Sequence, residues 1–273
     1  MISIITPVYK GEAHIGPTLE SMSKQKANFE HLVMDAASPD KTCAIVQSYT
    51  GRYNVRVISE KDEGHYDAVQ KGFAQTKGDI LGWINAGDLY MPWTLSVVEK
   101  LFELYPEVEW ITGVPAFFFD QTNLFRIDAS VPVYSQYAIR KGWHNGGTFP
   151  PIQQESSFWR RSLWDRSRGA EILRGQGKGK GYAADYLLWR RFAEHARLRT
   201  ACTVLAAFTI SPGQITDRFR DAYAQECGLK QYQKMPNPYT RSLFRLYSFW
   251  HTTVKSNAIS GKTLASDFPV RVL

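Results

Sequence analysis

Carboxylates and small polar residues follow four apolar runs in the first third of the chain, where they could hold a hydroxylated or anionic ligand. The clearest example is GWINAGDLYMP, residues 82–92, in which an apolar run ends in Asn85, Gly87 and Asp88. A carboxylate beside a glycine at the end of a strand is typical of the rim of a site. Mg²⁺ is commonly bound by one or two carboxylates together with phosphate oxygens. The segment therefore predicts a ligand site with Asp88 at its edge.

The other three apolar runs end in the same kinds of residue. They are followed by Thr6, Pro7, Tyr9 and Glu12, by residues 35–38 with Asp35, and by residues 60–64 with Glu60 and Asp62. Any one of these groups could be only a turn or a helix N-cap, since Asp, Ser and Asn favour both. Four of them in succession favour a shared ligand site.

Alternating strand and helix patterns over residues 1–115 would bring these groups together. Strands are expected at residues 2–8, 31–35, 55–59, 80–85 and 108–114, and helices at residues 13–25, 41–49, 67–76 and 92–104. Alternation with short links predicts an α/β fold with a Rossmann-like, mostly parallel central sheet flanked by helices. Ligands of such sheets bind at the carboxyl ends of the strands.

The alternation weakens beyond residue 116. Residues 116–150 are aromatic and loop-like, and residues 153–164 lead into a helix. The basic glycine segment 174–182 is either an exposed loop or a contact for phosphate or acceptor. A helix at 184–197, a strand at 200–210 and a helical, basic and aromatic tail at 218–256 are expected to follow.

Composition limits the class of protein. With 33 Lys and Arg against 26 Asp and Glu, the formal net charge of +7 suits an anionic partner such as a nucleotide diphosphate or an anionic lipid. The three cysteines have no zinc-ligand spacing and indicate reduced thiols in a cytoplasmic protein. We find no signal-peptide pattern and no apolar run of membrane-spanning length.

Several common motifs are missing. No G-x-G-x-x-G follows the first strand, which disfavours a dinucleotide-binding domain. The GKT at 261–263 lacks the earlier glycine of a P-loop, because Ser256 stands there. Neither an H-x-x-x-H pair nor a G-x-S-x-G elbow is present, so zinc-protease and serine-hydrolase chemistry have no support.

The strand-end segments, taken in order, resemble the motifs of family 2 glycosyltransferases with the GT-A fold. The segments are SIITPVYKGE, HLVMDAASPDKT, SEKDEGHYDAVQKGFAQTKGDILGWINAGD and QESSFWRRSLW…ADYLLWRRFA. The resemblance spans about residues 1–215, and residues 59–88 are its most specific part. It implies inverting transfer of a sugar from a nucleotide-diphosphate donor, usually with a divalent metal, Mn²⁺ or Mg²⁺. It also implies a domain at 1–215, with a nucleotide-sugar-binding half at 1–115 and an acceptor and catalytic half at 116–215, before a helical C-terminal extension at 216–273.

The resemblance assigns the nucleotide-sugar site residue by residue. Pro7, Tyr9 and Glu12 match the loop that holds the nucleotide, and Asp35 matches the acid that helps to hold the base and ribose. The positions that match the lining of the sugar-donor pocket are Glu60, Asp62, Tyr66, Asp67, Lys71 and Asn85. Lys71 can meet a diphosphate. It could equally form an i,i+4 salt bridge with Asp67, worth roughly 0.3–0.5 kcal/mol.

The metal site of the resembled family departs here from its usual pattern. Asp88 keeps the second of two acids that the family usually places after the fourth strand, whereas Gly87 replaces the first. Ser211 stands where many members have a histidine, and serine is a poor metal ligand. We therefore expect Asp88 to be the metal-facing acid and metal dependence to be weaker than usual in the family.

An inverting transfer needs a general base for the acceptor hydroxyl, and Asp185 is the first candidate. It shares one face of a predicted helix with Leu188, Trp189 and Phe192, so the carboxylate should point inward. The alternative is an acid that only offsets the helix dipole, worth about 0.3–1 kcal/mol. Asp185 also matches the family's base position, although Ala184 replaces the acid often found before it. Glu155 is the second candidate, as base or as a residue that orients sugar donor or acceptor.

The acceptor is less well defined. The resemblance implies a saccharide or lipid-linked acceptor and no nucleic acid. Trp143, Phe149, Trp159 and Trp164 could stack on an acceptor sugar, but core packing is the simpler interpretation for each. The tail at 241–255 either packs on the domain or contacts an anionic membrane, which would place a cytoplasmic protein at the inner face. A non-catalytic binder of sugar nucleotides and a nucleotidyltransferase are the alternative functions.

Overall fold

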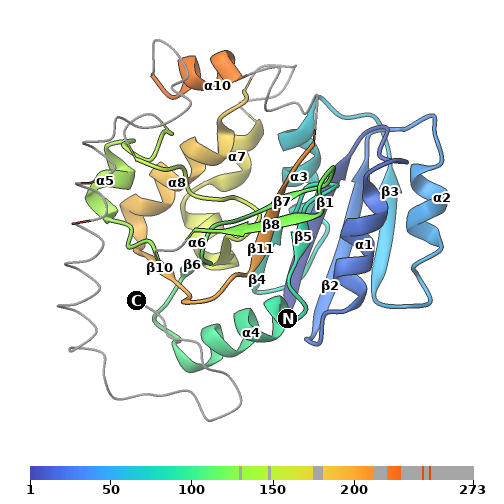
Figure 1. Cartoon of the computed structure of the whole chain (residues 1–273), viewed down its shortest axis with the longest axis horizontal. Coiled ribbons are helices and arrows are strands. Elements are labelled where there is room, and N and C mark those ends of the chain that lie inside the picture. Colours follow the sequence, from blue (N-terminus) through green and yellow to red (C-terminus); the bar gives the residue numbers. More distant parts are fainter. Residues whose placement is uncertain are drawn as a thin grey trace.

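The computed structural model describes residues 1–128, 131–146, 149–174, 181–211 and 220–228, together with Ser242 and Leu246. A seven-stranded sheet runs through the molecule in the order β10-β6-β9-β4-β1-β2-β3 (Figure 1). In that order the strands are β10 (Leu198–Thr200), β6 (Trp110–Thr112), β9 (Phe158–Arg160), β4 (Ile80–Trp83), β1 (Ile2–Val8), β2 (Phe29–Asp35) and β3 (Val55–Ser59). Only β9 runs antiparallel to its neighbours β4 and β6. The prediction of an α/β fold with a mostly parallel sheet is confirmed.

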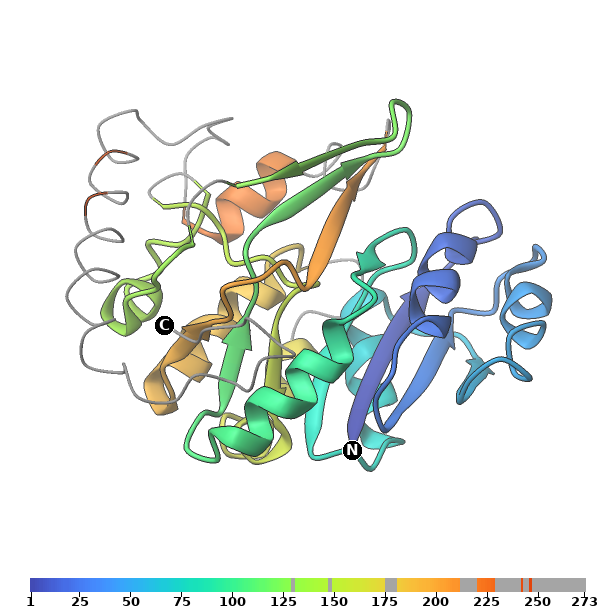
Figure 2. The same ribbon diagram turned by 60° about the horizontal axis from the view of Figure 1, so that its bottom comes forward.

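Helices cover both faces of this sheet (Figures 1 and 2). The helices are α1 (Ile15–Ser23), α2 (Thr42–Gln47), α3 (His65–Ala74), α4 (Thr94–Leu104), α5 (Gln136–Arg140), α6 (Arg161–Arg166), α7 (Gly169–Arg174), α8 (Ala184–His195) and α10 (Arg220–Glu226). Successive side chains of a strand point to opposite faces. Accordingly, Ile2 and Ile4 of β1 join a core cluster with α4, while Ile5 joins the cluster formed by α3, α6, α7 and α8.

Tryptophans dominate the cluster beneath α3, α7 and α8. Trp83 stacks on Trp189 with ring centroids 5.9 Å apart, and Trp159 lies 5.4 Å from Trp83. Trp159 is fully buried and Trp164 is 5% exposed. These two rings therefore pack in the core and are not available to stack on an acceptor sugar.

A second sheet of four strands has the order β5-β11-β7-β8. It is built from β5 (Leu89–Tyr90), β11 (Ala206–Ile210), β7 (Ala116–Phe119) and β8 (Leu124–Ile127). Figure 2 shows the β7–β8 hairpin extending from one side of the molecule beside β11. Through β5 and β11, this small sheet connects the end of β4 to the second half of the chain.

The sequence prediction was wrong at three places in the second half. Residues 116–150 were expected to be loop-like, but they contain β7, β8 and α5. The strand expected at 200–210 is divided between β10 and β11, which belong to different sheets, because the chain turns between them with Thr203 N–H donating to Ala201 O at 2.7 Å. Residues 153–164 lead into a helix, α6, as predicted, but strand β9 was missed, in which Phe158 and Trp159 are buried between β4 and β6.

Candidate active site

The strand-end residues of the first three parallel strands lie side by side. The register pairs Val8 of β1 with Asp35 of β2, and Asp35 with Ser59 of β3. The loops that follow these strands therefore start from one edge of the sheet, as the sequence predicted. Glu60 N–H also donates to Asp35 O at 2.9 Å, which ties the third loop to the second strand.

Asp35 is a buried acid held in a fixed orientation. Its Oδ2 atom accepts hydrogen bonds from Ser59 Oγ at 2.6 Å, Ser38 N–H at 3.0 Å and Cys43 Sγ at 3.3 Å. Burial raises the pKa of the carboxyl, but the hydrogen bonds from Ser38, Ser59 and Cys43 outweigh it, so that the pKa is lowered. Asp35 Oδ1 is buried and has no hydrogen-bond partner among the described residues. An ionised carboxylate with one uncommitted oxygen can accept a hydrogen bond from a ligand N–H or hydroxyl.

The loop after β1 has one residue that is free to contact a ligand. Pro7 is buried within β1, whereas the Tyr9 side chain is 59% exposed, with Lys10 Nζ 5.4 Å from the centre of its ring. Glu12 is engaged elsewhere, because its Oε2 accepts from Lys41 N–H at 3.1 Å and its Oε1 lies 3.9 Å from Lys41 Nζ. Of the three residues, Tyr9 is the one presented to solvent as a nucleotide-stacking residue would be.

The loop between β3 and α3 carries a small network of charges. Asp62 is half-buried and accepts from Gly64 N–H at 2.9 Å, and burial raises the pKa of its carboxyl. Asp67 Oδ2 lies 2.8 Å from Lys71 Nζ, and the same oxygen accepts from Glu63 N–H at 3.0 Å. The i,i+4 salt bridge that the sequence offered as an alternative to sugar-donor binding is therefore formed.

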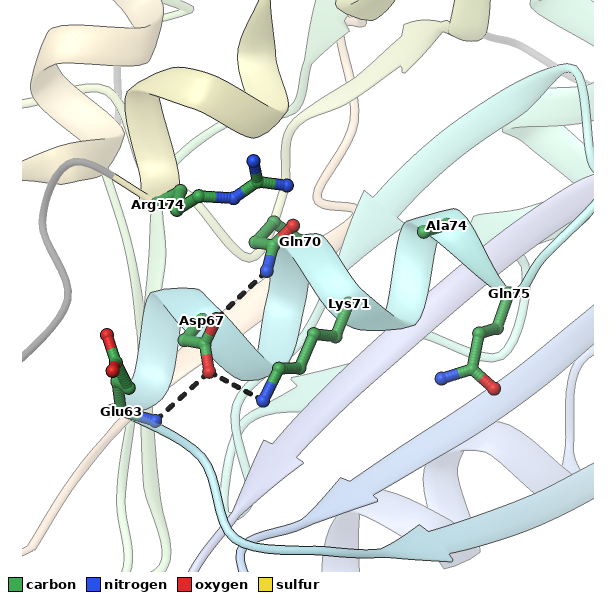
Figure 3. Close-up of a pocket in the computed structure, with 7 residues that line it drawn as sticks. All are labelled: Glu63, Asp67, Gln70, Lys71, Ala74, Gln75 and Arg174. Carbon is green, nitrogen blue, oxygen red and sulfur yellow. Dashed lines mark hydrogen bonds and ion pairs between the residues drawn. The ribbon is translucent and has the colours of Figure 1, made fainter.

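A pocket of about 560 Å³ lies along α3, as Figure 3 shows. Its lining residues are Glu63, Asp67, Gln70, Lys71, Ala74, Gln75 and Arg174. Asp67 and Lys71 thus border a cavity as well as pairing with each other. Asp88, Glu155 and Asp185 do not line it. The three candidate acids therefore lie outside the lining of this pocket.

Asp88 lies at the junction of the two sheets. Its side chain is 4% exposed, and its Oδ1 accepts from Thr209 N–H of β11 at 2.8 Å. Its Oδ2 is buried without a hydrogen-bond partner among the described residues. Burial raises the pKa of Asp88 to about 7, although hydrogen bonds from the Thr209 backbone and the Asn85 side chain oppose this rise.

The backbone conformation at position 87 explains why a glycine stands there. Its φ is +105°, a conformation that side chains with a Cβ rarely adopt. Gly87 N–H donates to Thr18 Oγ1 at 2.8 Å, and Gly87 O accepts from Thr209 Oγ1 at 2.6 Å. Thr18 also donates to Asp88 O at 2.9 Å. The turn that directs Asp88 is therefore clamped from α1 and from β11, in a backbone shape that disfavours an acid at position 87.

Glu155 is close enough to Asp88 and Asp185 for both charges to affect its pKa. Its side chain is 3% exposed, and its Oε1 is buried without a hydrogen-bond partner in the described part of the chain. Burial raises the pKa of Glu155 well above its ordinary value, and the charges of Asp88 and Asp185 raise it further. Two predicted catalytic acids and the predicted metal-facing acid therefore share one electrostatic environment, although they come from residues 88 to 185.

Asp185 occupies the first turn of α8, as predicted. It is half-buried, and Tyr66 Oη lies 3.4 Å from its Oδ1 and 3.3 Å from Tyr182 O. Burial raises the pKa of Asp185 to about 6, with the hydrogen bond from Tyr66 opposing the rise and the charge of Glu226 adding to it. Tyr66 was assigned from the sequence to the sugar-donor pocket, and the structure places it against the candidate base.

Glu226 was not among the site residues predicted from the sequence. Its carboxylate accepts hydrogen bonds from the backbone just before α8. No local pattern links a residue of α10 to a turn more than forty positions earlier, so no signal in the sequence could have found this contact.

The remaining candidates have separate places. Ser211 stands at the position expected to carry a third metal ligand. Its hydroxyl donates a hydrogen bond to the carboxylate of Asp120, which follows β7. No group of three or more His, Cys, Asp or Glu side chains suited to a metal is found in the described residues. Trp143 is 41% exposed and packs edge to face with Phe149 at 5.9 Å, so these two rings stay candidates for acceptor contact. Most of the glycine segment 174–182, the GKT at 261–263 and nearly all of the tail at 241–255 lie outside the described residues.

Comparison with known proteins identifies the family. The model of glycosyl transferase family 2 matches residues 3–166, which is more than half of the chain. The chain belongs to glycosyl transferase family 2. It is therefore an enzyme of the glycosyltransferase class, which excludes the nucleotidyltransferase alternative, and the resemblance seen in the sequence is confirmed.

Curated relatives of this family 2 glycosyltransferase match only part of their own length. An uncharacterized glycosyltransferase of Haemophilus influenzae is 32% identical over 113 residues, which are 41% of this chain and 37% of the relative. A dolichol-phosphate mannosyltransferase of Pyrococcus furiosus is 30% identical over 105 residues, 37% of this chain and 29% of the relative. The chain thus covers 37% and 29% of the length of these two relatives.

Solved structures support the fold. Staphylococcus aureus TarS, residues 1–349, in complex with UDP-GlcNAc has a TM-score of 0.61 at 17% identity, over 97% of this chain and 77% of that one. A mannosyltransferase from Pyrobaculum calidifontis with GDP-Man and Mn²⁺ has a TM-score of 0.57 at 17% identity, over 96% of this chain and 76% of that one. At this level of identity the likeness establishes the GT-A fold alone.

Proposed function

We propose that this glycosyltransferase moves a hexose or N-acetylhexosamine from a UDP- or GDP-sugar to a saccharide or lipid-linked acceptor, with inversion and with Asp185 as general base. The observation that carries the proposal is the half-buried Asp185 with a pKa of about 6, next to Tyr66 and within the electrostatic reach of Glu155. A base with this pKa is largely ionised at neutral pH, so it can accept the proton of an attacking hydroxyl.

In the proposed reaction, Asp185 and Glu155 have different roles. The acceptor oxygen forms a bond to the anomeric carbon while the bond from that carbon to the diphosphate oxygen breaks, and the hydroxyl proton passes to Asp185. Inversion follows if the acceptor attacks from the face opposite the diphosphate. Burial raises the pKa of Glu155 well above its ordinary value, which favours the protonated form, and in that form the carboxyl can donate a hydrogen bond to sugar donor or acceptor. In this proposal Asp185 is the base and Glu155 an orienting residue.

The nucleotide part of the sugar donor would lie along the edge formed by the first three strands. Asp35 offers its uncommitted oxygen to the base or ribose, and Tyr9 offers an exposed ring. Glu60, Asp62 and Lys71 are proposed to line the region between ribose and diphosphate. Lys71 would then exchange part of its contact with Asp67 for a phosphate oxygen.

A divalent metal fits this site only in part. Asp88 Oδ2 is an uncommitted buried oxygen, so Asp88 can supply one ligand, with Asn85 beside it. The position of Ser211 is taken up by its bond to Asp120, and Gly87 has no side chain to offer. These residues fit a Mn²⁺ or Mg²⁺ ion held mainly by the diphosphate and water. Such an ion would neutralise the charge that develops on the leaving diphosphate.

The names of matched proteins support a narrower choice of the transferred sugar. The names of the matched proteins include a dolichol-phosphate mannosyltransferase and, at 30% identity over 91 residues, the poly(ribitol-phosphate) beta-N-acetylglucosaminyltransferase TarS of Staphylococcus aureus. They support mannose or N-acetylglucosamine as the transferred sugar. No helix in the described residues is long and apolar enough to cross a bilayer. Peripheral membrane contact through the tail stays a proposal.

Measuring nucleotide release tests the proposal. Purified protein is incubated with UDP-GlcNAc, GDP-mannose or dTDP-glucose, with Mn²⁺ or with EDTA, and released nucleotide is quantified. We expect release from a UDP- or GDP-sugar that is stronger with Mn²⁺. Tight binding of the nucleotide sugars without release, even when saccharide acceptors are added, would instead indicate a non-catalytic binder.

A further inference from the structure

A carboxylate from α10 anchors the turn that begins α8. Glu226 Oε2 accepts hydrogen bonds from Tyr182 N–H at 2.7 Å and Ala183 N–H at 2.9 Å, and its Oε1 accepts from Gly181 N–H at 3.1 Å. Three successive N–H groups that converge on one anion form a nest. Here the anion is supplied by the chain itself, from beyond the residues that match the family model.

Helix α8 has no cap of its own at this end. Its N-cap residue is Ala183, which has no side-chain acceptor, and the first N–H groups of a helix need acceptors from outside it. Glu226, from a separate helix, supplies an acceptor for the N–H of this N-cap residue and for the two N–H groups before it. Because Asp185 follows only two residues after Ala183, the backbone that Glu226 fixes also sets the direction in which the Asp185 side chain leaves the helix.

A second helix, α3, and an apolar cluster also contact this turn. Tyr66 Oη of α3 lies 3.3 Å from Tyr182 O, so the turn is bonded to α3 as well as to α10. Cys227 is 7% exposed and clusters with Ala183 and Tyr186, with Tyr223 packed against them. The turn therefore has hydrogen bonds to two helices, α3 and α10, and an apolar contact, as the support of a fixed catalytic group requires.

We propose that Glu226 is a positioning residue, which holds residues 181–183 so that the Asp185 carboxylate faces the acceptor hydroxyl. This inference rests on the proposed function, in which Asp185 is the general base. A displacement of about 1 Å in a reacting group can cost about a hundredfold in rate. The turn therefore needs an anchor, and the geometry assigns that role to Glu226.

The charge of Glu226 gives the proposal a signature in pH. The titratable groups that face Asp185 are Tyr66 from α3, Glu155 from the segment before β9, and Tyr223, Glu226 and Cys227 from α10 and the residue after it. Burial is the largest cause that raises the pKa of Asp185, and the negative charge of Glu226 adds to it. Removing that charge should lower the pKa of Asp185 and move the acid limb of the rate profile to lower pH.

The test compares Glu226→Gln with Glu226→Asp and with Glu194→Gln. Glu194 is an exposed acid in the last turn of α8 that pairs with Arg191, so its replacement removes the same charge from the far end of the helix. Turnover is followed as nucleotide release from UDP-GlcNAc or GDP-mannose, whichever the wild type uses. We expect Glu226→Gln to lower kcat about tenfold or more with little change in KM for the sugar donor. Its acid limb should move to lower pH, Glu226→Asp should recover part of the rate, and Glu194→Gln should match the wild type.

Two results would overturn the proposal. One is an unchanged kcat and pH profile in Glu226→Gln, whatever its thermal stability. The other is a parallel loss of kcat, sugar-donor affinity and thermal stability without a shift of the pH profile, which a merely structural role produces.

A double-mutant cycle tests the contact even if the wild type releases no nucleotide. Thermal unfolding at pH 8 is measured for wild type, Glu226→Gln, Asp185→Asn and the double variant. We expect Asp185→Asn to stabilise less in the Glu226→Gln background, because the repulsion between the two charges has already been removed. Additive effects would contradict the coupling of Glu226 to Asp185. An absence of release together with coupling would reject the proposed activity and leave the contact between α10 and the turn intact.

Discussion

At the scale of single residues, the candidate site contains acids whose pKa values burial raises toward neutral pH. Asp88 and Asp185 have pKa values raised to about 7 and about 6, whereas hydrogen bonds to Asp35 lower its pKa despite burial. The contrast follows from their partners. Asp35 accepts three hydrogen bonds on one oxygen, while the burial of Asp88 outweighs its hydrogen bonds from the Thr209 backbone and the Asn85 side chain. The acid proposed to bind the nucleotide therefore favours its ionised form, whereas the acids proposed for the metal and for catalysis have raised pKa values.

The raised pKa of Asp185 predicts a stability that depends on pH. The folded-state pKa of about 6 lies above the ordinary value of 3.8, so folding favours the protonated form. This contribution to stability is fully present below the unfolded-state pKa and is lost as pH rises through about 6. Asp185→Asn should therefore unfold at the same temperature as the wild type near pH 4 and at a higher temperature at pH 8.

Thermal unfolding of both proteins between pH 4 and pH 8 measures the effect. Asp79→Asn is the control, because Asp79 is 86% exposed and its ion pair with the Met1 ammonium group, at 3.8 Å, is a surface contact that contributes little to stability, so its variant should stay close to the wild type. If Asp185→Asn showed no gain in melting temperature at pH 8, burial of an ionised carboxylate at this position would be ruled out.

Asp88 predicts a second result, for metal binding. Asp88→Asn keeps an oxygen that can accept from Thr209 N–H, so the fold should survive. Loss of the charge should weaken Mn²⁺ binding in the presence of UDP by roughly tenfold or more. Isothermal titration of Mn²⁺ into protein saturated with UDP measures this affinity.

Ser211→Ala is the matched comparison for that experiment. Ser211 stands where a third ligand was expected, but its hydroxyl donates to Asp120. Its variant should bind Mn²⁺ like the wild type. Equal affinities for wild type and Asp88→Asn, or a loss in Ser211→Ala as large as the loss in Asp88→Asn, would refute the assignment of Asp88 as the metal-facing acid.

At the scale of elements, the turn after β4 is as important as the acid that it carries. Residues 85–88 are clamped by Thr18 of α1 and Thr209 of β11, so two elements distant in sequence set the direction of Asp88. Local pattern made Asp88 a candidate site residue, and the family resemblance placed Gly87 where the first of two acids is usual. The sequence could not identify the clamp, because β11 was expected as part of one longer strand. The split of that strand depends on packing between two sheets, which no local pattern encodes.

Two glycines make a matched pair that tests this turn. Gly87 has φ +105°, and a methyl group added to its Cα would meet no atom closer than 4.0 Å, so Gly87→Ala should destabilise the fold by about 1–2 kcal/mol through backbone conformation alone. Gly16 lies in α1 with open space around the same position, so Gly16→Ala should be neutral or stabilise by up to about 1 kcal/mol. Urea unfolding of both variants measures the two changes. Equal effects in the two variants would contradict a positive φ at Gly87.

At the scale of the whole molecule, the strands and helices of the first half were largely predictable, whereas in the second half the prediction of a helix at 184–197 was confirmed by α8 but most strands were missed. Strands β1, β2 and β4 are largely buried on both faces and leave continuous apolar runs such as ISIITPV, which is why their positions and the shared edge could be predicted. In the second half, β9 enters the sheet antiparallel between β4 and β6, and the short β7, β8 and β10 leave only weak patterns. Asp185 was found through its helix face, whereas its partner Glu226 comes from a helix that meets α8 only in the folded chain.

The convergence of the acids also belongs to this scale. Asp88 follows β4, Glu155 precedes β9, and Asp185 begins α8, yet the charges of Asp88 and Asp185 both act on Glu155. The antiparallel insertion of β9 beside β4 explains this convergence, because it brings the start of β9 to the edge where β4 ends. The fold therefore brings the half of the chain proposed to bind the nucleotide together with the residues proposed for catalysis.

Turnover of Asp185→Asn against pH tests the central claim most directly. The rate of nucleotide release is measured from pH 5 to pH 9 for wild type and Asp185→Asn, with the UDP- or GDP-sugar that the wild type uses. The wild-type rate should rise as pH increases through about 6 and then level off, as Asp185 becomes ionised. Asp185→Asn should bind the nucleotide normally and lose about a hundredfold or more in kcat, without that rise. Wild-type turnover and an unchanged pH profile in Asp185→Asn would show that this residue is not the base.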